Sequence, residues 1–248
     1  MTSNDRFRNR VLQHLARTSP AVHAQLVAQL EPIFLERGVV LGIARKRTES
    51  VYFLESGIVS LIASTRSGDS LEVAIVGREG VAGIADALGQ RPLPYGWVVQ
   101  LSGIAYRAPT DVVRDHILSC TALHEVLMAY SQLMMHQLAQ SAVCNRFHTS
   151  EQRLSRWLLL TAERAGTMRF ELTHEFVAQM VGAPRSAVSQ AAAVLRRKGL
   201  IDYRRGVMTI RNVKRLRKAS CECFDAVSIG GDTQPGHSEV TVPGDTQL

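Results

Sequence analysis

The stretch VAQMVGAPRSAVSQAAAVLRRKGL, residues 177–200, combines hydrogen-bonding side chains with a core of small residues. Four polar residues share one side of the helix that Pro184 would open: Arg185, Ser186, Ser189 and Gln190. An Arg can bond guanine through two atoms, a Gln can bond adenine likewise, and a Ser can bond several base edges. Because small neighbours keep such a helix slim, we expect these four side chains to read bases in a DNA major groove.

Two short helices must position this face. Thr173 can cap the first helix, and Gly182 lies where the connection needs a positive φ, which glycine adopts at little steric cost. The inward stripe of the second helix is Val188, Ala192 and Leu195. This pattern predicts a helix-turn-helix, although an ordinary helical hairpin with a polar outer face would share it.

Positive charge is concentrated around this helical pair. Residues 149–220 hold 15 Lys and Arg against 5 Asp and Glu, while residues 1–148 hold 14 against 12 and residues 221–248 hold 0 against 5. The segment YRRG makes a basic hairpin tip, so we expect Arg204 and Arg205 to contact phosphates as a wing would. A solvated basic surface is the alternative, but the charge and the helical pattern together favour nucleic acid.

The N-terminal half predicts helices followed by a β-roll. Residues 7–31 show helical apolar spacing, with a second helix starting at Ser19-Pro20. Between Gly38 and Gly103, β-branched runs such as VYFLES, IVSLIAS and LEVAIV are separated by glycines, and SGD at 67–69 suits a hairpin turn. Several short strands at close spacing favour a small sandwich or barrel.

A long helix is expected over about residues 122–146, after a short helix capped by Thr110. Residues repeat along it at alternating spacings of four and three: Leu123, Leu127, Tyr130, Met134, Gln137 and Ser141. This spacing is typical of a coiled-coil seam, so we expect it to pair two copies of the chain. A helix packed on its own roll gives the same pattern, and both can hold because Val126 and Leu133 offer a second face.

These patterns divide the chain near His148. We expect a sensor domain over residues 1–120, a dimerisation helix over 121–148, a winged helix-turn-helix domain over 149–225 and a disordered tail over 226–248. Thr149 or Ser150 would cap the helix that opens the third part. The tail is polar, contains Gly and Pro, and has no periodicity.

Taken in order, these motifs resemble the Crp/Fnr superfamily of bacterial transcription regulators. The matching stretches are VYFLESGIVSLIAS and VAIVGREGVAG in the roll, CNRFHTSEQRLSRWLLLTAERAG at the hinge, and LTHEFVAQMVGAPRSAVSQAAAVLRRKGLIDYRRGVMTI. They span about residues 7–225, and CECF at 221–224 is similar to one subgroup's ending. The resemblance implies an α+β fold with an N-terminal jelly-roll like that of cyclic-nucleotide-binding domains, a long dimerisation helix and a C-terminal winged helix-turn-helix domain.

The same resemblance implies a homodimer that binds a palindromic operator in double-stranded DNA, one recognition helix in each major groove. It places Arg185, Ser186 and Gln190 at base-reading positions, with Ser189 on the same face, and Thr173 at a phosphate-contacting position. An effector signal would pass from the roll to the DNA-binding domain, and RNA polymerase is the further expected partner.

Departures from the family concern the effector. Cyclic-nucleotide members carry an acidic residue after a roll glycine and an Arg-Ser pair for the phosphate, whereas here Ile84 follows Gly83 and residues 92–97 read PLPYGW, with Arg91 nearby. Iron–sulfur members carry an N-terminal cysteine cluster, but no cysteine precedes Cys120. We therefore expect neither cyclic AMP nor such a cluster. The candidates for an unidentified effector's pocket are Gly77, Glu79, Gly83, Ile84, Tyr95 and Trp97.

The other cysteines give a weak signal. Cys221 and Cys223 lie one residue apart, and Cys144 is distant in sequence, which makes a poor metal site with few other ligands. We predict no metal and no cofactor, and we interpret these thiols as packing residues or an incidental pair. A redox or metal role is the alternative.

Other classes of function fit less well. A metal-dependent oxygenase needs clustered His and carboxylate ligands on facing strands, but none of the 8 His lies between residues 33 and 108. We therefore expect no enzyme, and a module that docks onto a protein partner is the remaining alternative. The polar start MTSNDRFRNR, the lack of an apolar run long enough to span a bilayer, and only 4 cysteines predict a cytoplasmic protein without membrane contact.

Overall fold

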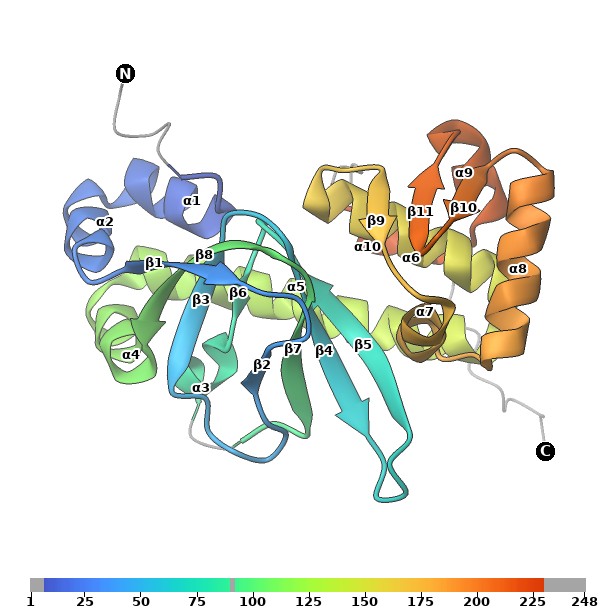
Figure 1. The fold of residues 1–248 in the computed structure, drawn as a ribbon. Helices are drawn as coiled ribbons and strands as arrows, with labels where there is room; N and C mark the ends of the chain where they lie inside the picture. The colour runs from blue at the N-terminus through green and yellow to red at the C-terminus, as the bar shows by residue number, and fades with distance from the viewer. Residues whose placement is uncertain (1–6, 90–91, 230–248) are drawn as a thin grey trace, which may run out of the picture.

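The computed structural model describes residues 7–89 and 92–229 and shows a β-roll and a helix-turn-helix domain, with one long helix running behind both (Figure 1). Arg91 lies outside the described residues, and so do residues 230–248, which form most of the predicted tail. Within the described part of the chain, no helix is both long and apolar enough to cross a membrane.

Two short helices open the described chain, α1 over Arg10–Thr18 and α2 over Pro20–Val27. Asn9 joins α1 to the roll, because its side-chain oxygen accepts from the backbone N–H groups of Val11 and Leu12 while its amide donates to carbonyl oxygens of the roll. Pro20 occupies the first turn of α2, as the sequence predicts.

The roll consists of two antiparallel four-stranded sheets, ordered β1-β8-β3-β6 and β2-β7-β4-β5. Its strands are β1 Glu31–Leu35, β2 Val40–Gly42, β3 Ser50–Leu54, β4 Ile58–Ser64, β5 Ser70–Val76, β6 Val81–Ala82, β7 Tyr95–Leu101 and β8 Gly103–Pro109. A short helix, α3 over Ile84–Leu88, follows β6. The β4–β5 hairpin turns through Gly68 at a φ of 97°, which confirms the predicted turn at 67–69.

Two helices follow the roll, α4 over Thr110–Ser119 and the 27-residue α5 over Thr121–Phe147. Thr110 is the first residue of α4 rather than its cap, and its hydroxyl donates instead to the carbonyl oxygen of Thr48 at 2.7 Å. Helix α5 ends where His148 takes an extended conformation, at the predicted break.

The stripe predicted as a dimer seam faces the roll of its own chain. Buried here are Leu123, Leu127, Tyr130, Gln137 and Ser141, and Met134 is partly buried against the same core. The Gln137 side chain accepts from the backbone N–H of Ile75 at 2.7 Å and donates to its carbonyl oxygen at 3.2 Å. The stripe therefore packs on the roll of its own chain, and its five buried side chains leave little surface for a second copy. Val126 and Leu133 also pack partly on the roll core.

The C-terminal part begins with α6, Ser150–Ala165, whose N-terminus carries a capping box between Thr149 and Gln152. The following elements are β9 Arg169–Glu171, α7 His174–Val181, α8 Arg185–Arg197, β10 Ile201–Arg204, β11 Val207–Ile210, α9 Val213–Ala219 and α10 Cys223–Val227. The three strands form one antiparallel sheet, ordered β10-β11-β9. Because α10 includes Ala226 and Val227, the start of the predicted tail was set too early.

Candidate nucleic-acid interface

Helices α7 and α8 form the predicted helix-turn-helix, and local chemistry explains each boundary. The Thr173 hydroxyl accepts from the backbone N–H of Phe176 and so caps α7. Helix α7 ends at Gly182, whose φ of 64° lies in the left-handed region. Pro184 is the N-cap of α8. The turn is also tight against the roll, because a Cβ on Gly182 would lie 2.4 Å from the Leu71 side chain.

The inner and outer faces of α8 differ as the sequence predicts. Val188, Ala192 and Leu195 are buried, together with Ala191. Arg185, Ser186 and Gln190 are exposed on the other side. The Arg185 side chain is 70% exposed, and its guanidinium lies 3.7 Å from the Glu175 carboxylate. A pair this exposed contributes little to stability, so the guanidinium remains available to a ligand.

Ser189 differs from its three predicted partners. It is half-buried, and its hydroxyl lies 2.9 Å from Nδ1 of His174. The His174 ring stacks on Tyr203 at 4.3 Å between centroids, and the Tyr203 hydroxyl donates to the carbonyl oxygen of Leu172. Burial, and then the charge of Arg185, lower the pKa of His174, which favours the neutral ring. Ser189 therefore helps to join α8 to the wing strand β10. Sequence reasoning missed this role of His174.

The wing is a two-residue hairpin between β10 and β11. Its loop residues, Arg205 and Gly206, both have positive φ, 49° and 79°, as a type I′ turn requires. The Arg204 side chain is 84% exposed, and its Nε lies 3.4 Å from the Asp202 carboxylate. A hydrogen bond from Arg211 lowers the pKa of Asp202, and the carboxylate thereby supports the base of the wing. Both predicted wing arginines are exposed.

More basic residues surround the two helices. Arg196, Arg197 and Lys198 are exposed at the end of α8, and Lys214, Arg215, Arg217 and Lys218 are exposed on α9. Cations on the last turn of a helix are also favoured by its dipole. The outer face of α8 thus lies within a basic surface that suits a polyanion.

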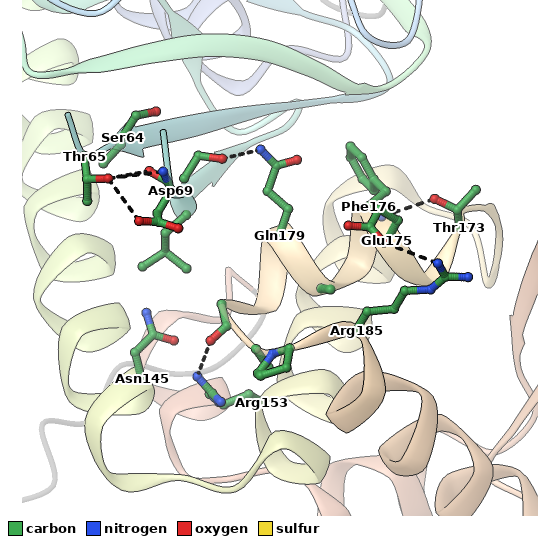
Figure 2. Close-up of a pocket in the computed structure, with 17 residues that line it drawn as sticks. Ser64, Thr65, Asp69, Asn145, Arg153, Thr173, Glu175, Phe176, Gln179 and Arg185 are labelled. Atoms are coloured by element: carbon green, nitrogen blue, oxygen red, sulfur yellow. Dashed lines mark hydrogen bonds and ion pairs between the residues drawn. The ribbon is translucent and has the colours of Figure 1, made fainter. Parts of the chain in front are cut away.

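A pocket of about 1080 Å³ separates this domain from the β4–β5 hairpin (Figure 2). Gln179 of α7 reaches across to the hairpin and donates to the Ser70 hydroxyl at 2.5 Å. Arg153 of α6 donates to the carbonyl oxygen of Gly182 at 3.1 Å. Thr173 and Arg185 also line this pocket, so the start of the recognition helix lies close to the roll.

Two buried polar contacts join α6 to the roll. The Trp157 indole donates to the Glu72 carboxylate at 2.8 Å, and Arg164 donates through Nε to Glu79 at 2.9 Å. All four residues are buried. Helix α6, which also packs against α8, is therefore in direct contact with both the roll and the helix-turn-helix.

The role of the six residues predicted to line an effector pocket stays a prediction. Glu79 is paired with Arg164, and a Cβ on Gly77 would lie 2.8 Å from the same Arg164 side chain. The others are in the roll: Gly83 and Ile84 begin α3, and Tyr95 and Trp97 pack edge to face on β7.

Comparisons with known proteins bear on this arrangement. Residues 152–219 match the model of the Crp-like helix-turn-helix domain. The chain is 24% identical over 188 residues to the global nitrogen regulator of Synechococcus elongatus, covering 71% of this chain and 84% of that protein. It is 23% identical over 206 residues to the CRP-like cAMP-activated global transcriptional regulator of Mycobacterium tuberculosis, covering 80% and 92%.

The fold has a counterpart among solved structures. A transcriptional regulator of the Crp/Fnr family from Eubacterium rectale superposes with a TM-score of 0.66 at 13% identity, over 85% of this chain and 98% of that one. The roll, the long helix and the C-terminal domain therefore have the predicted architecture. Both curated relatives are named as global regulators, and that of Mycobacterium tuberculosis as a transcriptional one, in agreement with the predicted class.

Proposed function

We propose, on the premise that this chain is a DNA-binding transcription regulator of the Crp/Fnr superfamily, that it acts as a homodimer on a palindromic operator. The observation that carries the proposal is the exposed row of Arg185, Ser186 and Gln190 on α8, beside a basic wing. These side chains would read base edges, while Arg204, Arg205 and Thr173 would contact phosphates. Ser189 would act mainly by holding α8 against His174.

The homodimer would form through the outer face of α5, not through the stripe that packs on the roll. Four exposed apolar side chains lie on this face: Met128 42%, Met135 62%, Val143 45% and Phe147 72%. Met128 and Met135 are one heptad apart, which suits the seam of a helix pair. Burying this face against its copy would remove an apolar surface from water and give the assembly two-fold symmetry.

An effector and RNA polymerase complete the proposal. A ligand that changed the roll would act on the recognition helix through the contacts that join β5 and its following turn to α6, those of Glu72 and Glu79. RNA polymerase would be engaged by the DNA-bound dimer.

Base reading is tested by comparing Arg185→Ala with Arg204→Ala on a selected operator and on random DNA. The first change should cost about 1–3 kcal/mol on the operator and relax the preference at one base pair. The second should weaken binding to both DNAs alike. It should also reduce the slope of log affinity against log salt concentration by about one. Lys46→Ala, an exposed cation in the roll, serves as the matched control.

The outcomes separate the alternatives. Equal losses for Arg185→Ala on operator and random DNA would contradict the base-reading role. Association that does not depend on salt, without protection of any DNA sequence, would favour a module that docks onto a protein.

A further inference from the structure

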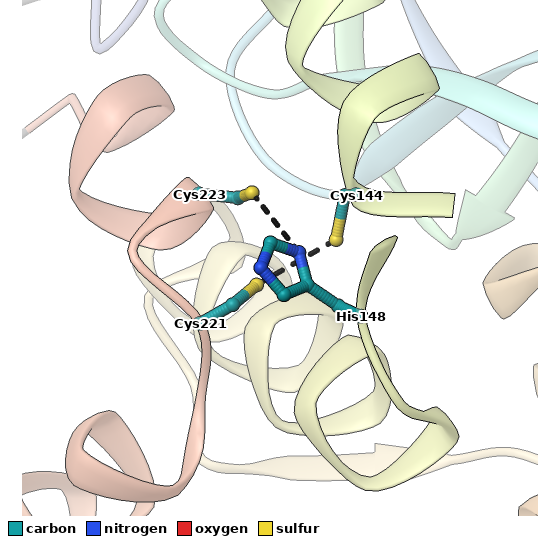
Figure 3. A group of neighbouring side chains, drawn as sticks. All are labelled: Cys144, His148, Cys221 and Cys223. Atoms are coloured by element: carbon teal, nitrogen blue, oxygen red, sulfur yellow. Dashed lines mark hydrogen bonds between the residues drawn. The ribbon is translucent and has the colours of Figure 1, made fainter. Parts of the chain in front are cut away.

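Four metal-ligand side chains meet where α5 ends and α10 begins (Figure 3). Cys144 lies in the last turn of α5, and His148 is the C-cap of that helix. Cys221 follows α9, and Cys223 is the first residue of α10. In the sequence, Cys144 is distant from the other two thiols and few further ligands are nearby, which counted against a metal site. Folding removes both objections.

The spacing of the donor atoms suits a single tetrahedral ion. The sulfur atoms of Cys144 and Cys221 lie 3.6 Å apart, and the Cys223 sulfur lies 3.5 Å from Nδ1 of His148. All four ligand atoms lie within 4.8 Å of one another. With Zn–S bonds of ~2.3 Å and Zn–N bonds of ~2.0–2.1 Å, a tetrahedron has S–S edges of ~3.8 Å and S–N edges of ~3.6 Å. The donors are therefore already near the positions that an ion would require.

The four side chains are largely buried. The three cysteines form a buried cluster separate from the two apolar cores, and the His148 side chain is only 12% exposed. Buried thiols without a role are common, but three thiols and an imidazole facing one point are not explained by apolar packing. The fourth thiol, Cys120, packs in the roll core and offers an internal comparison.

Neighbouring groups orient the ligands. Nε2 of His148 lies 3.2 Å from the Glu222 carboxylate, which leaves Nδ1 to face the thiols. A metal-bound His commonly donates its other N–H to a carboxylate in this way. The Gln140 amide donates to the Cys223 sulfur at 2.9 Å, as a partner that stabilises a thiolate would.

We propose that Cys144, His148, Cys221 and Cys223 bind one zinc-type divalent ion. Three thiolates and a neutral imidazole suit zinc, and four protein ligands leave no open position for a substrate, so the role is structural. On binding, the thiols release their protons to solvent and no oxidation takes place. The ion would tie α10 to the junction between α5 and α6, which lies between the roll and the DNA-binding domain.

The test uses the full-length protein, purified under reducing conditions and freed of metal by a chelator. Co²⁺ is added as the probe, because tetrahedral thiolate coordination gives Co²⁺ strong charge-transfer and d–d absorption. We expect saturation at one Co²⁺ per chain, displacement by Zn²⁺, and a rise in Tm on addition of either ion. Cys221→Ser and His148→Asn should reduce Co²⁺ affinity at least about tenfold, and Cys120→Ser should leave it unchanged.

Several outcomes would overturn the proposal. One is reduced wild-type protein that shows no thiolate-to-Co²⁺ absorption and no change in Tm. Another is binding that Cys120→Ser weakens as much as Cys221→Ser does. A third is protein that, isolated without reductant, lacks metal, has lost two hydrogens by mass and yields a proteolytic peptide pair linking Cys144 to Cys221, which would identify a disulfide instead of a metal site. Because the wild-type titration needs no substitution, a variant that fails to fold does not prevent a decision.

Discussion

Glu72 allows a test of how the roll and the DNA-binding domain are joined. Its carboxyl group is buried between β5 and α6, with the Trp157 indole on one oxygen and the Ser60 hydroxyl 2.5 Å from the other. Ser60 has a single hydroxyl hydrogen, which the Gln100 amide oxygen can accept at 2.9 Å. A protonated Glu72 would then donate to Ser60, so the network is complete with a neutral carboxyl group.

The pKa of Glu72 sets how much its carboxyl group changes the free energy of unfolding with pH. Burial raises the pKa of Glu72 from 4.5 to about 8, although hydrogen bonds from Ser60 and Trp157 to the ionised carboxylate act in the opposite direction. The folded protein therefore keeps a proton that the unfolded chain releases above pH 4.5. The resulting stability is fully present below pH 4.5 and is lost as the pH rises to about 8. At 1.36 kcal/mol per pKa unit, the total loss is on the order of 5 kcal/mol.

Glu72→Gln replaces the neutral acid by a neutral amide of similar shape and should abolish this loss. We would measure the free energy of unfolding by urea titration between pH 5 and pH 9, following tryptophan fluorescence. As the pH rises across that range, the free energy of unfolding of Glu72→Gln should increase by several kcal/mol relative to that of wild type. The control Glu125→Gln, on the exposed side of α5, should show the same dependence on pH as wild type. Profiles of wild type and Glu72→Gln that stay parallel within about 0.5 kcal/mol would refute a neutral buried carboxyl group.

Three further predictions concern the contacts of α6, of the helix-turn-helix and of α5. Arg164→Met should destabilise the protein by about 3–5 kcal/mol in urea titrations because it leaves the buried Glu79 carboxylate unpaired, and adding Glu79→Leu should recover much of that loss. If the double variant is no more stable than the single one, the pair is not the cause. Gly182→Ala should lower Tm and increase hydrogen exchange in the β4–β5 hairpin, because the new methyl group would clash with Leu71 and position 182 has a positive φ. Unchanged hydrogen exchange in this hairpin would count against the contact between Gly182 and Leu71. Met135→Asp should shift the protein from dimer to monomer in analytical ultracentrifugation without changing its circular dichroism, and a retained dimer would place the interface elsewhere.

The helix-turn-helix could be predicted from sequence because its determinants are local. Thr173 caps the helix that follows it, Gly182 supplies a positive φ, and Val188 marks an inward stripe of its own helix. Each of these signals depends on residues within a few positions of one another. The exposed side of α8 follows from them directly.

The errors arose where distant parts of the chain meet. Alternating spacing along α5 reports that a face is buried, but it cannot say whether a second chain or the roll covers it. The sequence gives no sign that Gln137 pairs with the backbone of Ile75. In the same way, Cys144 and Cys221 are 77 positions apart, and only the fold brings their sulfur atoms together.

The length of α5 has a mechanical consequence. At 27 residues it is about 40 Å long, and it makes contact with α1 and, towards its C-terminal end, with α10. A rigid rod of that length, pivoting by only about 5° at its N-terminal end, would swing its far tip by roughly 3.5 Å. That exceeds the reach of a hydrogen bond, so a tilt too slight to disturb the packing of the pivot would be enough to uncouple the contacts at the tip.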